Sequence, residues 1–356
     1  MTSYEDFFTK EFATQLDTAK KEFQRELFDT EIKPIEEDKL VFLGTGMSSW
    51  VTYGGSNYVP QRTGAGLRVV MDGIAIHIDP GYLAAAQTMK YCGVAPIDGI
   101  VGTHVHPDGV CGLQELLFYA GRGGLRKQKP VLMGNKTLVE GFELDGKQIR
   151  FLPNDPLFVG NCSNIISLAP GDEYELGKLK LIATPVDHPE WFRKEPAFSV
   201  NKGIGLKIVG SKFTVSYVGE TSVHGTAQTH WGQARSLTEG SYDRSGESKL
   251  DQIAEAHQGA DILICPIASL VPNSVSPGNH MRIDGVYELA NIVKPKKLFL
   301  TDISAECDMN RMTDLSDVYD TNKTIDETFI RYGARALEDK LGILVRVMSD
   351  GTEVKL

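Results

Sequence analysis

The spacing of apolar residues sets the first part of the chain apart from the rest. Over residues 1–28, apolar side chains recur every three or four positions, with charged and amide side chains between them: Tyr4, Phe8, Phe12, Leu16, Ala19, Phe23 and Leu27. This period predicts one long amphipathic helix. We expect its apolar stripe to pack on the body of the protein, with a dimerisation arm as the alternative. Pro34 and the acidic residues after it end the segment, which defines residues 1–38 as an N-terminal helical extension.

From Lys39 onward, short apolar runs alternate with glycine-rich turns and helical periods. The apolar runs predict strands at residues 40–43, 67–70, 74–78, 97–101, 131–133, 179–184, 205–209, 213–218, 262–266, 297–300 and 343–347. Helical periods cover residues 84–91, 112–119, 285–292 and 326–341. The repeated order of strand, turn and helix favours two packed sheets with helices outside, or a doubly wound sheet. No linker-like stretch divides this region, so residues 39–356 are predicted to form one domain.

One long polar stretch interrupts this pattern at residues 222–249. It is rich in Gly, Ser, Thr, Gln and His, and it contains Trp231. Loops of this length are uncommon inside compact domains unless they act as lids or are flexible. The large apolar ring of Trp231 favours a lid over a flexible loop.

Composition and charge exclude several classes of protein. The hydrophobic and charged fractions of 41% and 24% are ordinary for a globular chain and argue against a disordered or fibrous one. With 37 Lys and Arg against 47 Asp and Glu, the net charge is −10, so we expect no strong general nucleic-acid binding and prefer a small anionic partner. Five scattered cysteines without a CxxC pair, and no apolar leader or membrane-length run, predict a cytoplasmic protein that does not bind membranes. A homo-oligomer remains open.

The sharpest chemical signal is the sequence THVHPDG at residues 103–109, directly after a predicted strand. His104 and His106 lie two residues apart on a loop, so both rings can turn toward one point. Imidazole nitrogens bind divalent metals at about 2.0–2.1 Å. Asp108, two residues further on, can reach a neighbouring site. The alternative is a pair of exposed or hydrogen-bonded loop histidines.

Three later strands also end in potential metal ligands. His188 follows the strand at 179–184, Glu220 follows that at 213–218, and Asp302 follows that at 297–300. Each has an ordinary explanation on its own: a loop histidine, a capping or surface acid, and a helix N-cap. Four strand ends with ligand side chains together indicate a metallohydrolase.

These motifs resemble the metallo-β-lactamase-fold hydrolases, and within them the ribonuclease Z-like phosphodiesterases. The resemblance runs from about Leu40 to Leu356 and rests on LGTG at 43–46, Arg62, IDPG at 78–81, the 103–109 motif with GL at 112–113, YVGET at 217–221, GNHM at 278–281, KLFLT at 297–301 and VRVMSDG at 345–351. It implies an α/β fold of the αββα sandwich type, with a metal site at one edge between the sheets.

The resemblance also implies a role for each candidate residue. The first metal would be held by His104, His106 and His188. Glu220 would bridge to a second metal held by Asp108 and Asp302. His280 matches the family's phosphodiesterase histidine, which assists the scissile phosphate and the leaving group.

Three positions depart from the family pattern. Gly109 stands in place of a second-site histidine, Glu220 in place of the bridging aspartate, and Asp302 in place of the last histidine of an LTH motif. The first site keeps three imidazoles and a carboxylate, which suits zinc, whereas the second has oxygen ligands only. A carboxylate-only site favours manganese or magnesium and binds zinc less selectively, and an empty second site is the alternative.

The main functional hypothesis is hydrolysis of a small phosphodiester, such as a cyclic nucleotide, or of an RNA end. A metal would activate water, Asp108 would orient it, and His280 would stabilise the phosphate or protonate the leaving oxygen. Two alternatives stay open. One is an ester or lactone hydrolase on the same scaffold, which needs no His280. The other is a catalytically altered sensor that binds a ligand and signals through the N-terminal helix.

Overall fold

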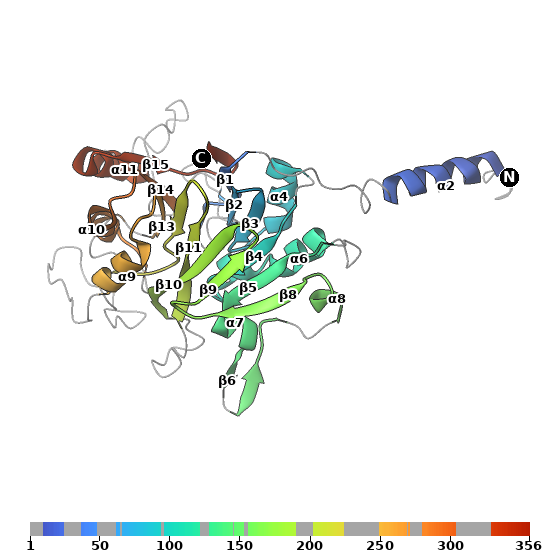
Figure 1. Cartoon of the computed structure of the whole chain (residues 1–356), viewed down its shortest axis with the longest axis horizontal. Helices are drawn as coiled ribbons and strands as arrows, with labels where there is room; N and C mark the ends of the chain where they lie inside the picture. Colours follow the sequence, from blue (N-terminus) through green and yellow to red (C-terminus); the bar gives the residue numbers. More distant parts are fainter. Residues whose placement is uncertain are drawn as a thin grey trace, which may run out of the picture.

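The strands of the fold form two large sheets that face each other (Figure 1). The computed structural model describes residues 10–24, 37–47, 62–64, 66–93, 96–121, 128–144, 146–152, 156–189, 202–223, 249–268, 270, 280–303 and 329–356. Most of the predicted lid, residues 224–248, lies outside these described residues. No helix in the described part of the chain is long and apolar enough to cross a membrane.

Each large sheet has seven strands and mixes parallel with antiparallel neighbours. The first runs in the order β16 (Thr352–Lys355), β1 (Lys39–Phe42), β2 (Leu67–Met71), β3 (Ile74–Ile78), β4 (Gly99–Gly102), β5 (Val131–Asn135) and β8 (Asn164–Leu168). The second runs in the order β15 (Leu344–Val347), β14 (Lys297–Ile303), β13 (Ile262–Ile267), β12 (Thr214–Tyr217), β11 (Lys202–Val209), β10 (Leu179–Pro189) and β9 (Glu173–Leu176). A separate hairpin joins β6 (Phe142–Leu144) to β7 (Lys147–Ile149).

Helices cover the outer faces of both sheets (Figure 1). Along the first sheet these are α4 (Ala84–Cys92), α5 (Pro107–Val110), α6 (Leu113–Gly121), α7 (Lys136–Glu140) and α8 (Pro156–Val159). Along the second they are α9 (Leu250–His257), α10 (Ile283–Val293) and α11 (Phe329–Leu341). The order of layers is therefore helix, sheet, sheet, helix, as the resemblance implies, and not a doubly wound sheet.

The two sheets are held together by a core of alternating side chains. Phe42 of β1 and Phe299 of β14 meet edge to face across the two sheets, with ring centroids 6.0 Å apart. Both rings are fully buried. Because alternate residues of a strand point to opposite faces, the intervening residues pack against the helices instead. This rigid centre fixes the strand ends, and the candidate site lies where those ends meet.

The predicted strands are present, with differences at their ends. The largest difference is in β10, which extends beyond the predicted residues 179–184 to Pro189. His188 therefore lies on the strand itself. Five described strands and four short helices have no counterpart in the prediction: β6, β7, β8, β9, β16, α5, α7, α8 and α9. Most are short, and the three-residue β6 and β7 are too brief to show a period.

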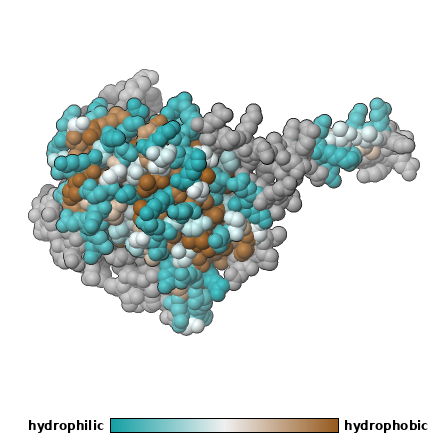
Figure 2. Space-filling model, in the orientation of Figure 1, coloured by the Kyte–Doolittle hydropathy of each residue, from teal (hydrophilic) through white to brown (hydrophobic). Residues whose placement is uncertain are grey.

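The N-terminal extension contains α2 (Lys10–Gln24), shorter than the predicted helix. Residues 11–22 are all exposed, including Phe12 and Leu16, and Figure 1 shows α2 extending away from the sheets. Hydrophilic residues cover much of α2 on the face seen in Figure 2. The expectation that this helix packs on the body is therefore wrong for the described residues, and the dimerisation arm remains open.

We expect removal of residues 1–24 to change the melting temperature of the remaining protein by less than about 2 °C. Exposed side chains contribute little to the free energy of unfolding, so their loss costs little. Calorimetry of the truncated and full-length chains at low protein concentration measures this. A larger drop, accompanied by a fall in mass during sedimentation, would instead show that the helix joins two copies of the chain.

Candidate metal centre

His104 and His106 are positioned by the turn between β4 and the short helix α5. Pro107 occupies the first position of α5, and His106 has the extended backbone of an N-cap residue. The two imidazoles are nearly perpendicular, with centroids 5.0 Å apart. The His104 side chain is almost fully buried, whereas that of His106 is 26% exposed. Both ligand atoms of the motif therefore face one point at the end of the first sheet.

His188 and Glu220 come from neighbouring strands of the second sheet. His188 lies near the end of β10, and Glu220 follows β12 after a tight turn at Gly219, whose φ of 74° favours glycine. The turn is tied back to β10 because the Asp187 backbone N–H donates to Thr221 Oγ1 over 2.7 Å. Both side chains are buried. The second sheet thus presents one imidazole and one carboxylate to the two histidines of the first.

These four side chains converge on a small volume between the sheets. Their ligand atoms all lie within 4.8 Å of one another. Glu220 Oε2 lies 2.9 Å from His104 Nε2, 3.0 Å from His188 Nε2 and 3.7 Å from His106 Nδ1. The His188 Nε2 to His106 Nδ1 distance is 3.0 Å. The structure therefore brings together the predicted three-histidine set and Glu220.

The donor set fits a divalent cation. Tetrahedral ligands at 2.0–2.1 Å from zinc are about 3.3 Å apart. The four separations given above, 2.9–3.7 Å, bracket that value, and all pairs lie within 4.8 Å. His104 Nε2 and Glu220 Oε2 are buried, yet neither makes a well-directed hydrogen bond within the described part of the chain. Buried polar atoms are normally satisfied. These two unsatisfied atoms, together with the nearby nitrogens of His106 and His188, are the groups that would hold a metal.

The sequence analysis did not identify the residues that hold the His104 ring in place. Asp79, at the end of β3, accepts hydrogen bonds of 2.7 Å from both the backbone N–H and the hydroxyl of Thr103, and it also shares a hydrogen bond with Tyr217. Since the Thr103 hydroxyl donates to Asp79, its oxygen is left to accept from His104 Nδ1, 3.2 Å away. That hydrogen bond directs the Nε2 lone pair of His104 toward the other ligands. The signal was available, because Asp79 is a further polar residue at a strand end.

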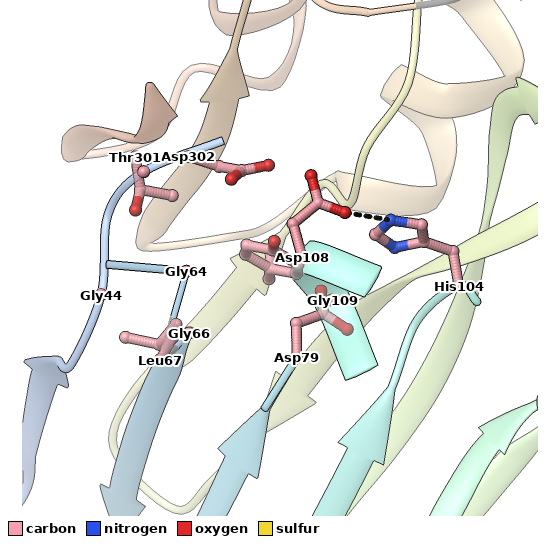
Figure 3. Close-up of a pocket in the computed structure, with 12 residues that line it drawn as sticks. Gly44, Gly64, Gly66, Leu67, Asp79, His104, Asp108, Gly109, Thr301 and Asp302 are labelled. Carbon is pink, nitrogen blue, oxygen red and sulfur yellow. Dashed lines mark ion pairs between the residues drawn. The ribbon is translucent and has the colours of Figure 1, made fainter. Parts of the chain in front are cut away.

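Asp108 and Asp302 lie beside the four-residue cluster rather than in it. They line a cavity of about 20 Å³, together with Asp79, His104 and backbone of the glycine-rich loops. Figure 3 shows the carboxylates of Asp108 and Asp302 pointing toward each other, with Asp108 Oδ1 3.9 Å from His104 Nε2. A volume of this size has room for one atom group the size of a water molecule. Its oxygen-rich lining is the type of site that hard cations prefer.

Gly109 has no room for a side chain. A Cβ at this position would lie 2.8 Å from His104 Cε1 and 3.2 Å from His104 Nδ1. The second-site histidine of the resembled family is therefore not simply absent here, since the imidazole of His104 fills the space beside Gly109.

Asp302 is held in place by pairing between β14 and the loop after β1. The Ile303 backbone N–H donates to the Thr45 carbonyl over 2.7 Å, and the Met47 N–H donates to the Ile303 carbonyl. Asp302 itself has a φ of 49°, which turns it out of the regular strand. Burial, followed by the charges of Glu220 and Asp108, raises its carboxyl pKa well above the ordinary value. Its alternative as a helix N-cap lies outside the described residues, which stop at 303 before resuming at 329.

The two oxygens of Glu220 face different partners. Oε2 faces the three imidazoles, but Oε1 lies 2.7 Å from His280 Nδ1. A bridge that used both oxygens would require Oε1 to face the second site, and bridging by Glu220 stays a prediction. The extra methylene of glutamate allows it to reach His280 instead.

The charges in the site set the protonation of the histidines. Burial opposes a charge on His104, but the neighbouring Glu220 carboxylate outweighs this effect and raises the His104 pKa to about 10. Burial lowers the His188 pKa to about 4, despite Glu220. At neutral pH and without metal, His104 therefore carries a proton and His188 does not.

We expect Zn²⁺ uptake to release about one proton at pH 7–9, because His104 must be neutral to act as a ligand. Since the proton competes with the metal below the His104 pKa, the apparent Kd should fall about tenfold for each unit of rising pH in this range. Calorimetric titration in buffers of different ionisation enthalpy measures the proton count. Uptake without proton release would contradict the assigned charge of His104.

Solved structures share this architecture across most of the chain. The metallo-β-lactamase fold protein YhfI from Bacillus subtilis is 13% identical and superposes with a TM-score of 0.59, covering 90% of this chain and 100% of that one. A diphosphatase from the PhnP family gives 18% identity and a TM-score of 0.54, covering 90% and 97% of the two chains. The short form of human tRNase Z gives 16% identity and 0.51, covering 89% and 98%. No family model and no curated protein sequence matches the chain.

The chain therefore has the metallo-β-lactamase fold, as the sequence predicts, with a His and Glu group suited to a metal at the edge between its sheets. A diphosphatase and a tRNase Z are among its structural neighbours. At these identities the likeness establishes the fold alone, because one fold supports many reactions.

Proposed function

We propose that this protein is a metal-dependent hydrolase that cleaves a small phosphodiester. The observation that carries the proposal is the convergence of His104, His106, His188 and Glu220 within 4.8 Å, beside a cavity lined by Asp108 and Asp302. Phosphate-ester chemistry is favoured by His280 at the same site and by the PhnP-family and tRNase Z neighbours. The net charge of −10 favours a compact anion, such as a cyclic nucleotide, over a long RNA.

Each group has one task in this proposal. A bound divalent cation supplies Lewis acidity, which polarises a phosphoryl oxygen and lowers the pKa of water to about 7. Asp108 accepts a hydrogen bond from the attacking water and orients it. Asp79 and Thr103 keep His104 in the tautomer that binds a cation. His280 donates a proton to the leaving oxygen through Nε2, since its Nδ1 faces Glu220.

The two parts of the site favour different metals. Three imidazoles and a carboxylate suit Zn²⁺. The carboxylates of Asp108 and Asp302 suit Mg²⁺ or Mn²⁺ in the adjacent cavity, where zinc would bind less selectively. Because Glu220 Oε1 faces His280, the second site depends on fewer protein ligands and is the weaker of the two.

The test combines metal analysis with a substrate panel. The metal-depleted protein is reloaded with Zn²⁺, alone or with Mn²⁺, and assayed on a generic phosphodiester, cyclic nucleotides, a carboxylic ester and a lactone. We expect turnover of phosphodiesters only after reloading, and none from His104→Ala. A wild-type protein that cleaves only the ester or lactone, with equal rates in His280→Ala, would support the rival hydrolase. Tight nucleotide binding without turnover would support the sensor.

A further inference from the structure

The contact between His280 and Glu220 gives His280 a structural task beside its chemical one. His280 Nδ1 lies 2.7 Å from Glu220 Oε1, and its side chain is 16% exposed. This buried nitrogen makes no well-directed hydrogen bond within the described part of the chain, so its contact with Glu220 is a close ion pair. Glu220 is more deeply buried still, with its side chain 3% exposed. Each group is therefore the nearest partner available to the other in a place that water hardly reaches.

This contact decides which way the carboxylate faces. With Oε1 against His280, Oε2 is left toward His104 and His188, at 2.9 and 3.0 Å. His280 also packs against His188, with centroids 5.1 Å apart and the rings tilted by 50°. A carboxylate without such a partner has a free torsion about its last bond and presents either oxygen, or both, to the cluster. The contact thus restricts this torsion, whose free rotation would weaken metal binding through a single oxygen.

We propose that His280 is a positioning residue that fixes Glu220 as a one-oxygen ligand of the three-histidine site. The inference rests on the proposed metal site but not on the identity of the substrate. Partners of metal ligands typically change metal affinity by 10–100-fold when they are removed. It follows that Glu220 serves the first site alone and that any second cation relies on Asp108 and Asp302.

Two substitutions separate this task from acid catalysis. Asparagine carries its amide nitrogen at the place of Nδ1, whereas glutamine carries it at the place of Nε2. We expect His280→Gln to raise the Kd for Co²⁺ by about 10–100-fold and to alter its visible absorption, while His280→Asn stays within about threefold of wild type. Competition with a chromogenic chelator measures the Kd, and circular dichroism of the metal-free proteins verifies folding. Arg282→Gln is the matched control, because it changes a nearby residue that pairs with Asp284.

Glu220→Asp tests the same contact from the other side. The shorter carboxylate does not span the distance from the imidazoles to His280, so in this background His280→Gln and His280→Asn should bind Co²⁺ equally. Equal Kd values for wild type, His280→Gln and His280→Asn would overturn the inference, as would equal losses in both variants. A wild type that binds no Co²⁺ would overturn the proposed function and this inference together. Binding of Co²⁺ without phosphodiester turnover would overturn only the proposed function.

Discussion

Replacing Asp108 by alanine should lower phosphodiester turnover by about 10²–10⁴-fold while Zn²⁺ stays bound at the three-histidine site. The range is that of a positioned acid or base in a transition state. Asp108 lines the cavity between His104 and Asp302, but it is not among the four ligand atoms that lie within 4.8 Å of one another. Steady-state kinetics, together with zinc content measured by atomic emission, tests both halves of this prediction.

The control for Asp108→Ala is Glu115→Ala, which removes an exposed acid from the first turn of the neighbouring helix α6. We expect its turnover to match wild type. If Asp108→Ala retained full turnover, Asp108 would have no part in the reaction. If it lost the tightly bound zinc as well, Asp108 would belong to the first site, and the division into two neighbouring sites would be wrong.

The position of the site was predictable because its ligands stand at strand ends. An apolar run in the sequence predicts a buried strand, and the first polar residues after it mark the edge of a sheet. His104, His188 and Glu220 all follow such runs, and the structure places their ligand atoms together. The family resemblance added what spacing could not: that the strands belong to two facing sheets, so that ends far apart in sequence meet at one edge.

The orientation of individual side chains was not predictable. That Glu220 directs one oxygen to the imidazoles and the other to His280 depends on a single methylene and on distances of a few ångströms. The partner of α2 was also unpredictable, since an apolar stripe shows that a helix has a face to cover but not what covers it. In the structure, Phe12 and Leu16 remain exposed. The sequence thus predicts which residues are candidate ligands more reliably than which of their atoms contact each other.

Substitution of Gly109 by alanine should weaken Zn²⁺ binding by about 10–100-fold, although glycine to alanine normally favours a helix. The new Cβ would lie 2.8 Å from His104 Cε1, so the ring must move. His104 is buried, and its Nδ1 contacts the Thr103 hydroxyl, which is itself bonded to Asp79; moving the ring therefore disturbs the support as well as the ligand. Chelator competition measures the affinity, and thermal unfolding of the metal-free protein measures stability.

Gly333→Ala in α11 is the matched control, because its Cβ would meet the Leu270 side chain at 3.2 Å, away from the histidines. We expect it to leave Zn²⁺ affinity unchanged. Gly109→His, which restores the residue type of the resembled family, should lose more affinity than Gly109→Ala, since a whole imidazole must then enter the space that His104 fills. A gain in metal content from Gly109→His would show instead that His104 yields easily. In that case position 109 could accept a histidine ligand, and the packing of the first site would not be the reason for its glycine.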